Sequence, residues 1–225
     1  ANPNIQNSNG ESVLSLAISA NHKNIVQTLL EFGSNPDMKT KDGYTPLMFA
    51  LEEFHADIAE MLLNYGADPN TQTKDGLTPL MLASLNDREN IVDMLLDYGA
   101  EPNMPTKDGH TPLMLASQNG HENIVQMLLD YGAELNIQDN EGSTALILAC
   151  QYGYKDIVKM LLDKGANHMI ENNKGDTALA IAQRSDDREI IHLLDSKRPR
   201  TTAEISSSDR VLNSEKQMSN GSGYQ

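Results

Sequence analysis

Six histidines and one cysteine are the residues of this 225-residue sequence with the greatest potential for metal or nucleophilic chemistry. His22, His55 and His121 are separated by multiples of 33 residues, which would place them in different layers of a repeated structure. Packed helical layers lie about 8–10 Å apart, whereas zinc–nitrogen bonds are only about 2.0–2.1 Å long. We therefore expect these histidines to pack in turns, and we predict no metal site.

Cys150 is the one candidate for a thiol nucleophile. One and two repeat lengths earlier, its position is occupied by Ser117 and Ser84, which predicts a small side chain packed between helices. A thiol buried in apolar surroundings stays protonated and is a poor nucleophile. The sequence also lacks a Gly-rich phosphate loop, an H-E-x-x-H motif and a G-x-S-x-G motif. We therefore predict no enzymatic activity, no catalytic residues and no cofactor.

The elements that would position these residues follow a period of 33. Residues 74–103 are nearly repeated by residues 107–136. One series of glycines falls at positions 10, 43, 76, 109, 142 and 175, and a second falls at positions 33, 66, 99, 132 and 165. A fixed period of this length is typical of a solenoid, in which a unit buries its apolar face only by stacking on its neighbours.

Each unit carries the signals of a turn followed by two helices. Asp75-Gly76 predicts a turn, and Thr78 followed by Pro79 predicts a capped helix start. A second helix is expected to begin near Glu89, with apolar residues along one side, and to end at Gly99. The same register predicts that the second helices start near residues 23, 56, 89, 122, 155 and 188.

These units resemble the ankyrin repeat. The resemblance is carried by GYTPLMFA, GLTPLMLA, GHTPLMLA, GSTALILA and GDTALAIA, and by GADPN at residues 66–70, and it covers residues 1 to about 195. It implies an all-α repeat solenoid of about six stacked helix-turn-helix repeats with β-turn fingers. It also implies a concave groove formed by the fingers and the inner helices, but no particular partner.

The register divides the chain into repeats at 9–41, 42–74, 75–107, 108–140 and 141–173, with a C-terminal repeat at 174–196. Residues 1–4 align with residues 67–70, so we expect residues 1–8 to be the end of a preceding repeat and the chain to be a fragment of a longer array. The first complete repeat is as apolar as an interior one, whereas terminal repeats usually have a polar outer face.

Residues 197–225 differ in composition from the repeats, with many Ser, Asn and charged residues and few large apolar ones. Such a segment cannot bury enough surface to order itself, so a disordered tail is predicted. The basic run KRPR at residues 197–200 is either a localisation signal or a set of solvated charges at a helix end.

Charge and cysteine content restrict the partners and the location. Residues 1–195 hold 12 Lys and Arg against 29 Asp and Glu, a formal balance of −17. An acidic body argues against nucleic acid and favours a basic or polar protein partner. A single cysteine fits a reducing compartment, so an intracellular, cytoplasmic location is predicted. No apolar run reaches the roughly 18 residues of a membrane span, and we expect no membrane insertion and a monomeric fragment.

Outward-facing positions at which the repeats differ are the candidate protein-binding residues. On the fingers they are Lys41, Asp42, Tyr44, Lys74, Asp75, Leu77, Lys107, Asp108, His110 and Glu141. At the inner helices they are Glu52, Glu53, Phe54, Leu85, Gln118, Asn119, Gln151 and Tyr152. Aromatic residues are frequent interface anchors, and they make up only 4% of this sequence, which singles out Tyr44, Phe54 and Tyr152. The alternative is that single exposed apolar residues have no partner.

The sequence therefore predicts a non-catalytic protein–protein interaction module, a scaffold or adaptor that binds a protein or peptide in its groove. An alternative is a spacer, targeting or regulatory arm of a larger multidomain signalling protein or enzyme. A third possibility comes from the resemblance, because Asn70, Asn103 and Asn136 match the asparagine that asparaginyl hydroxylases modify in similar proteins. The ordinary role of these asparagines would be to hydrogen-bond the finger turn.

Overall fold

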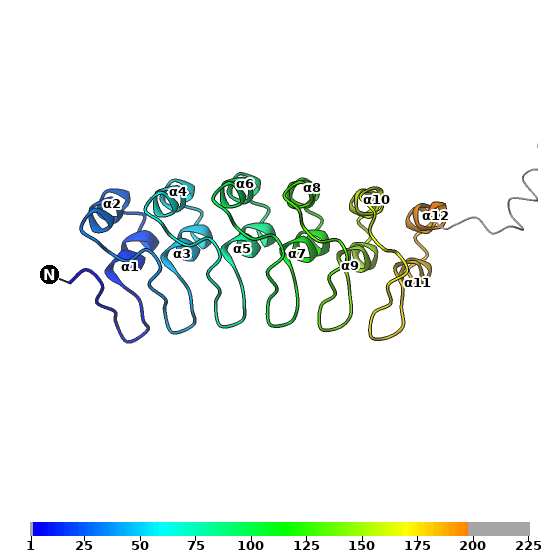
Figure 1. Ribbon diagram of the computed structural model, residues 1–225, viewed down its shortest axis with the longest axis horizontal. Coiled ribbons are helices and arrows are strands. Elements are labelled where there is room, and N and C mark those ends of the chain that lie inside the picture. The colour runs from blue at the N-terminus through cyan, green and yellow to red at the C-terminus, as the bar shows by residue number, and fades with distance from the viewer. Residues whose placement is uncertain (1, 198–225) are drawn as a thin grey trace, which may run out of the picture.

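A computed structural model describes residues 2–197, which form a row of stacked helix pairs (Figure 1). The first, inner helices are α1 (Val13–Ser19), α3 (Pro46–Glu52), α5 (Pro79–Leu85), α7 (Pro112–Asn119), α9 (Ala145–Tyr152) and α11 (Ala178–Arg184). The second, outer helices are α2 (Lys23–Glu31), α4 (Ala56–Asn64), α6 (Glu89–Asp97), α8 (Glu122–Asp130), α10 (Lys155–Asp163) and α12 (Arg188–Ser196). The long loops below the helices in Figure 1 are the finger loops.

The all-α repeat solenoid predicted from the sequence is confirmed. All six outer helices start at the predicted positions, from Lys23 in α2 to Arg188 in α12. Within residues 2–197, extended pairing is limited to two isolated bridges, Gln6 with Ser12 and Glu171 with Thr177. The predicted disordered tail and most of the KRPR run lie outside the described residues.

Threonine caps start the inner helices. The Thr78 side chain accepts a hydrogen bond from the backbone N–H of Met81, which satisfies one of the donors left free at a helix start. The equivalent caps are Thr45, Thr111, Thr144 and Thr177. The first pair uses Ser12 instead, and the Ser15 hydroxyl accepts a hydrogen bond from the Ser12 backbone N–H. Each inner helix therefore begins at a point fixed by its own sequence.

Neighbouring finger loops are joined through their backbones. The Lys107 N–H donates to the Asp75 carbonyl at 2.9 Å. Gly76 directly follows Asp75 in the finger and has a φ of +84°. A Cβ on Gly76 would lie 2.9 Å from the Lys107 nitrogen. Gly76 is thus required both by its left-handed conformation and by the close approach of the next finger. At Gly175, in the last finger of the described chain, a Cβ would meet nothing within 4 Å.

A second connection joins the repeats at the other end of each finger loop. The Asn70 side chain donates to the Gly99 carbonyl at 3.0 Å and accepts from the Glu101 N–H at 2.7 Å. Asn103 makes the equivalent bonds to Gly132 and Glu134. These asparagines were expected to hydrogen-bond the finger turn, and the side-chain partners of Asn70 and Asn103 lie in the loop of the following repeat. Their amides tie one repeat to the next.

The apolar core runs continuously through the stack between the inner and outer helices. Val92, Val125 and Leu128 are fully buried, and so are the methionines that follow each Thr-Pro-Leu, including Met81 and Met114. Met fills irregular core gaps through its flexible side chain. None of the helices in the described part of the chain is long and apolar enough to cross a membrane.

Core packing and helix capping predict different costs within the fourth repeat. Leu128→Ala should lower the free energy of unfolding by about 2–5 kcal/mol, because it opens a cavity in the core. Thr111→Ala should cost about 1 kcal/mol, because it removes the cap on the Met114 N–H. Urea denaturation of both variants measures the difference. A Thr111→Ala cost equal to or above that of Leu128→Ala would contradict this assignment of core and cap.

Candidate functional site

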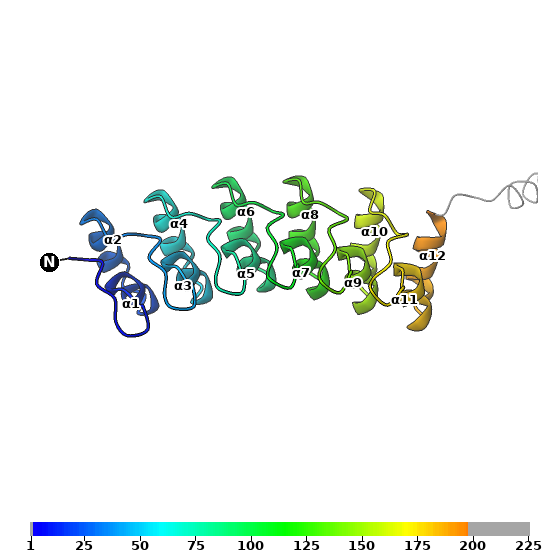
Figure 2. The ribbon, with the colours of Figure 1, turned by 60° about the horizontal axis from the view of Figure 1, so that its bottom comes forward.

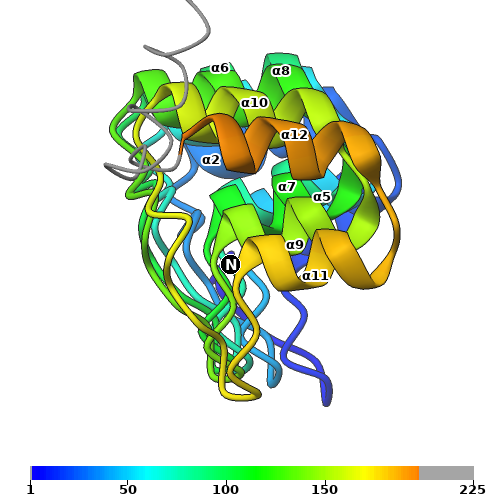
Figure 3. The same ribbon diagram turned by 90° about the vertical axis from the view of Figure 1, so that its right-hand side faces the viewer.

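The finger loops and the inner helices flank the surface that the sequence predicts to be the binding groove, and we call this surface the groove. Figure 2 shows the finger loops as a row in front of the inner helices, which extends along the whole stack. In the end-on view of Figure 3, the finger loops project downward on the left, and the turn joining α11 to α12 lies at the opposite end of the pair. The groove therefore presents equivalent positions of successive repeats in a line.

The finger tips supply exposed charges. All of the predicted charged contact residues at the finger tips are exposed: Lys41, Asp42, Lys74, Asp75, Lys107, Asp108 and Glu141. The Lys74 ammonium lies 3.7 Å from the Asp42 carboxylate of the preceding finger. Exposed pairs of this kind contribute little to stability in water, so most of these groups are available for contacts outside the chain.

Half-buried side chains follow the finger tips. Tyr44, Leu77 and His110 occupy the same position of three successive repeats, and their backbone N–H groups are held by the hydroxyls of Thr40, Thr73 and Thr106, respectively. These hydroxyls close each turn and fix the direction of the adjacent side chain. Three different side chains are therefore presented by one conserved backbone arrangement.

Tyr44 and His110 have neighbours within the groove. The Tyr44 ring lies 5.9 Å from the Phe49 ring, and burial, followed by the charge of Glu52, raises the pKa of the Tyr44 hydroxyl. The His110 Nε2 lies 3.5 Å from the Asp139 carboxylate of the next finger. Both rings are thus partly oriented before any partner binds.

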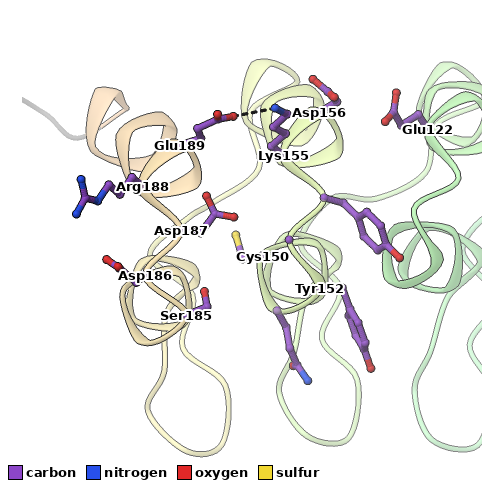
Figure 4. A pocket seen from close by; sticks show the side chains of 13 residues that line it. Glu122, Cys150, Tyr152, Lys155, Asp156, Ser185, Asp186, Asp187, Arg188 and Glu189 are labelled. Atoms are coloured by element: carbon purple, nitrogen blue, oxygen red, sulfur yellow. Dashed lines mark hydrogen bonds and ion pairs between the residues drawn. The ribbon is translucent and has the colours of Figure 1, made fainter.

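The inner helices contribute a second row of candidates. Glu52, Glu53, Asn119, Gln151 and Tyr152 are exposed, and Leu85 and Gln118 are half-buried. Tyr152 is 49% exposed, and its hydroxyl accepts a hydrogen bond from Gln118 at 3.2 Å. Figure 4 shows the Tyr152 ring pointing away from α10, toward the side of the finger loops. The structure therefore joins Gln118 and Tyr152 across two repeats.

Phe54 is placed apart from the other candidates. It lies in the turn between α3 and α4, at the end of the helix pair opposite the fingers, and its φ is +61°. The Arg88 guanidinium carbon lies 3.9 Å from the centre of its ring. A large side chain with a positive φ is unusual and costs about 1–3 kcal/mol. Phe54 therefore belongs to the turns between helices and not to the groove.

Paired contacts join these helix–helix turns along the stack. We call them the turn ladder: from Phe54 onward, a residue with positive φ faces the residue that precedes the next outer helix. Phe54 contacts Arg88, and the Asp87 carboxylate lies 3.3 Å from the His121 ring. Tyr154 fills the space beside Gly120, where a Cβ would lie 2.5 Å from the ring. The sequence alone did not predict this ladder, although its partners recur 34 residues apart.

The last step of the turn ladder leaves an open hollow of about 860 Å³. Here Gly153 faces Asp187, and a Cβ on Gly153 would meet only the Asp187 carboxylate at 3.9 Å. Gly153 and Asp187 are both smaller than tyrosine, so they do not fill the space that the Tyr154 ring fills one step earlier. Figure 4 shows the hollow, with the 2.9 Å contact between Lys155 and Glu189 at its edge. It lies at the turns, and the groove candidates Gln151 and Tyr152 form part of its lining.

Cys150 borders this hollow but is 1% exposed. Burial, with a smaller effect from the Asp187 carboxylate, raises the pKa of its thiol to about 12. A thiol with that pKa is almost wholly protonated near neutral pH. Among residues 2–197, no group of three or more His, Cys, Asp or Glu side chains could hold a metal ion. The groups that line the hollow therefore do not form a nucleophile or a metal centre.

Comparison with protein families gives one clear match. The model described as ankyrin repeats (3 copies) matches residues 1–73, 65–139 and 132–204. No curated protein matches the sequence.

The buried thiol predicts slow chemistry at Cys150. With a pKa of about 12 in place of the ordinary 9.0, the thiolate fraction at pH 8 falls about a thousandfold. A colourless aromatic disulfide that releases a coloured thiolate should react at least about a hundredfold more slowly with the native protein than with the urea-unfolded chain. Native and unfolded rates within tenfold of each other would show that the thiol is accessible and ionised.

Strain at Phe54 predicts a stabilising substitution. Asn21 occupies the same position of the first repeat with a φ of +54°, and Asn tolerates this conformation better than Phe. In an Arg88→Ala background, Phe54→Asn should raise the free energy of unfolding by about 1 kcal/mol. With Arg88 present the gain should be smaller by about 0.5–1 kcal/mol, because the cation–π contact is lost. A double-mutant cycle in urea measures both values, and destabilisation in both backgrounds would contradict the strain.

Proposed function

The chain belongs to the ankyrin-repeat family, and from that premise we propose that it is a non-catalytic protein-binding module whose partner docks in the groove between the finger loops and the inner helices. Ankyrin repeats are generally protein–protein interaction modules, and such solenoids use their extended concave surfaces for binding. A scaffold or adaptor role fits a stack that offers one continuous surface along its length.

One observation carries this proposal: the scaffold residues repeat, while the groove residues beside them differ. Thr45, Thr78 and Thr111 make the same helix cap. The residues directly before them, however, are an aromatic, an aliphatic and an imidazole side chain. If the position directly before each capping threonine contributed only to stability, one type of side chain could occupy it in every repeat. The variation at this position therefore supports a surface adapted to a specific partner.

The side chains of the groove favour a protein or peptide with basic or polar groups. Glu52 is exposed and close enough to Tyr44 to affect its hydroxyl, Glu53 is exposed at the end of the same helix, and Asp42 lies at the adjacent finger tip. Exposed carboxylates attract cationic groups and give selectivity more than affinity. Anchoring would come from Tyr44, Leu77 and Tyr152, since buried aromatic and aliphatic contacts dominate interface energies. The acidic balance of the repeats also favours a protein over a nucleic acid.

The same proposal includes two further statements: the protein is not an enzyme, and it is located inside the cell. The protonated state of the buried Cys150 thiol supports a structural role for the one cysteine in the sequence. A chain with one cysteine forms no internal disulfide, which supports a reducing compartment such as the cytoplasm.

Binding to the groove can be tested with a matched pair of tyrosines. Once affinity capture and mass spectrometry have identified a partner, Tyr152→Ala should weaken its binding by at least about fivefold, or about 1 kcal/mol, with little effect on folding. Tyr131→Ala is the control, because Tyr131 follows outer helix α8 and is similarly exposed, at 43% against 49%. Titration calorimetry measures both. Loss of binding in Tyr131→Ala alone would place the partner on the outer face and contradict the proposal.

A further inference from the structure

The first helix pair exposes an apolar face. Val13, Leu16 and Ile25 of α1 and α2 are 49%, 51% and 48% exposed. Ile5 and Phe32 lie in the adjoining loops and are also exposed. We call the face of a pair directed toward lower residue numbers its leading face, and the opposite face its trailing face.

The same leading-face positions are covered in every later repeat. The equivalents of Ile25 are all buried: Ile58, Ile91, Ile124, Ile157 and Ile190. Ile190 identifies what covers them, because the described residues place a helix pair before α11 and α12 but none after. Ile190 is nevertheless fully buried. The preceding helix pair therefore covers this position, and Ile25 is exposed because the described residues place no helix pair before α1.

The opposite end of the stack has a different surface. The trailing-face position occupied by buried leucines, such as Leu96 and Leu162, holds the exposed Asp195 in the last pair. Similarly, Gln183 replaces Ser117 and Cys150, which are buried in the interior repeats. A polar outer face is what a terminal repeat needs for contact with water. The last pair has that face, and the first pair does not.

The loop before α1 already holds the register of an interior loop. The Asn4 side chain accepts from the Asn35 N–H at 2.8 Å, as Asn70 accepts from Glu101 at 2.7 Å. The Gln6 amide donates to the Lys39 carbonyl at 2.9 Å. Two repeat lengths later, the Gln72 amide makes the same contact with the Pro105 carbonyl at 3.0 Å. These bonds define where a further helix pair would sit.

We propose that the leading face of α1 and α2 is the docking surface for one further helix pair of the ankyrin type, with an apolar trailing face. Five interior interfaces show how such a pair covers Val13, Leu16 and Ile25. This site is distinct from the groove, and the proposal does not depend on which partner the groove binds.

A grafted repeat tests the proposal directly. Residues 108–134 of this chain are placed before Pro3, in place of residues 1 and 2, which keeps the 33-residue register. The graft should raise the melting temperature by about 5 °C or more. It should also slow amide hydrogen exchange in α1 and α2 by about tenfold or more, while exchange in α7 changes little.

The control graft carries Leu129→Asp and Ser117→Gln in the added copy, which reproduces the polar trailing face of the last pair. It should give less than half of either effect. Equal effects of the two grafts, or no effect of the apolar graft, would overturn the proposal. Sedimentation of the unmodified chain tests a different occupant: a dimer that Ile25→Gln dissociates would show that a second copy covers the face, which also overturns it.

Discussion

The close backbone contact between neighbouring finger loops is the constraint on which the stack depends. A finger N–H reaches the carbonyl of the preceding finger at 2.9–3.1 Å at every step. That distance leaves no room for a side chain at Gly43, Gly76 or Gly109, where a Cβ would lie within 3.0 Å of the next finger's backbone. An insertion within one repeat would shift these partners relative to each other, so the fixed period of 33 follows from this contact.

A second tie fixes the angle between repeats. Asn70 and Asn103 bond the following repeat at the far end of the finger loop, beyond the end of the outer helix. Two separated points of attachment restrict the rotation of one repeat on the next more than either does alone. The groove residues therefore stay in line, and Tyr44, Leu77 and His110 can differ in chemistry while their spacing along the groove is constant.

The sequence was sufficient for features that depend on local signals. Thr-Pro caps, apolar stripes and helix-ending glycines lie within one repeat, and they gave the helix starts and the core. Features that need the distance between repeats were missed. The partners of Asn70 lie 29 and 31 residues away, and those of the turn ladder lie 34 residues away. Phe54 was grouped with the groove because its turn directly follows an inner helix, whereas the helix carries it to the opposite end.

The turn ladder shows that nearly identical repeats are not interchangeable. Arg88 suits the Phe54 ring, and His121 suits the Asp87 carboxylate. Tyr154, in turn, fits only where Gly120 has no side chain. Exchanging two repeats would place an aromatic ring against a carboxylate or a side chain into an occupied space. Each outer helix is therefore specific for the repeat before it.

The same dependence makes the first pair special, because its leading face is built for a neighbour that the described residues do not supply. The stability of a solenoid is a sum of unit and neighbour terms, so a pair docked there would slow local opening of α1 and α2. The adjacent finger, which bonds Lys41 beside the acidic end of the groove, would be held more rigidly for its partner.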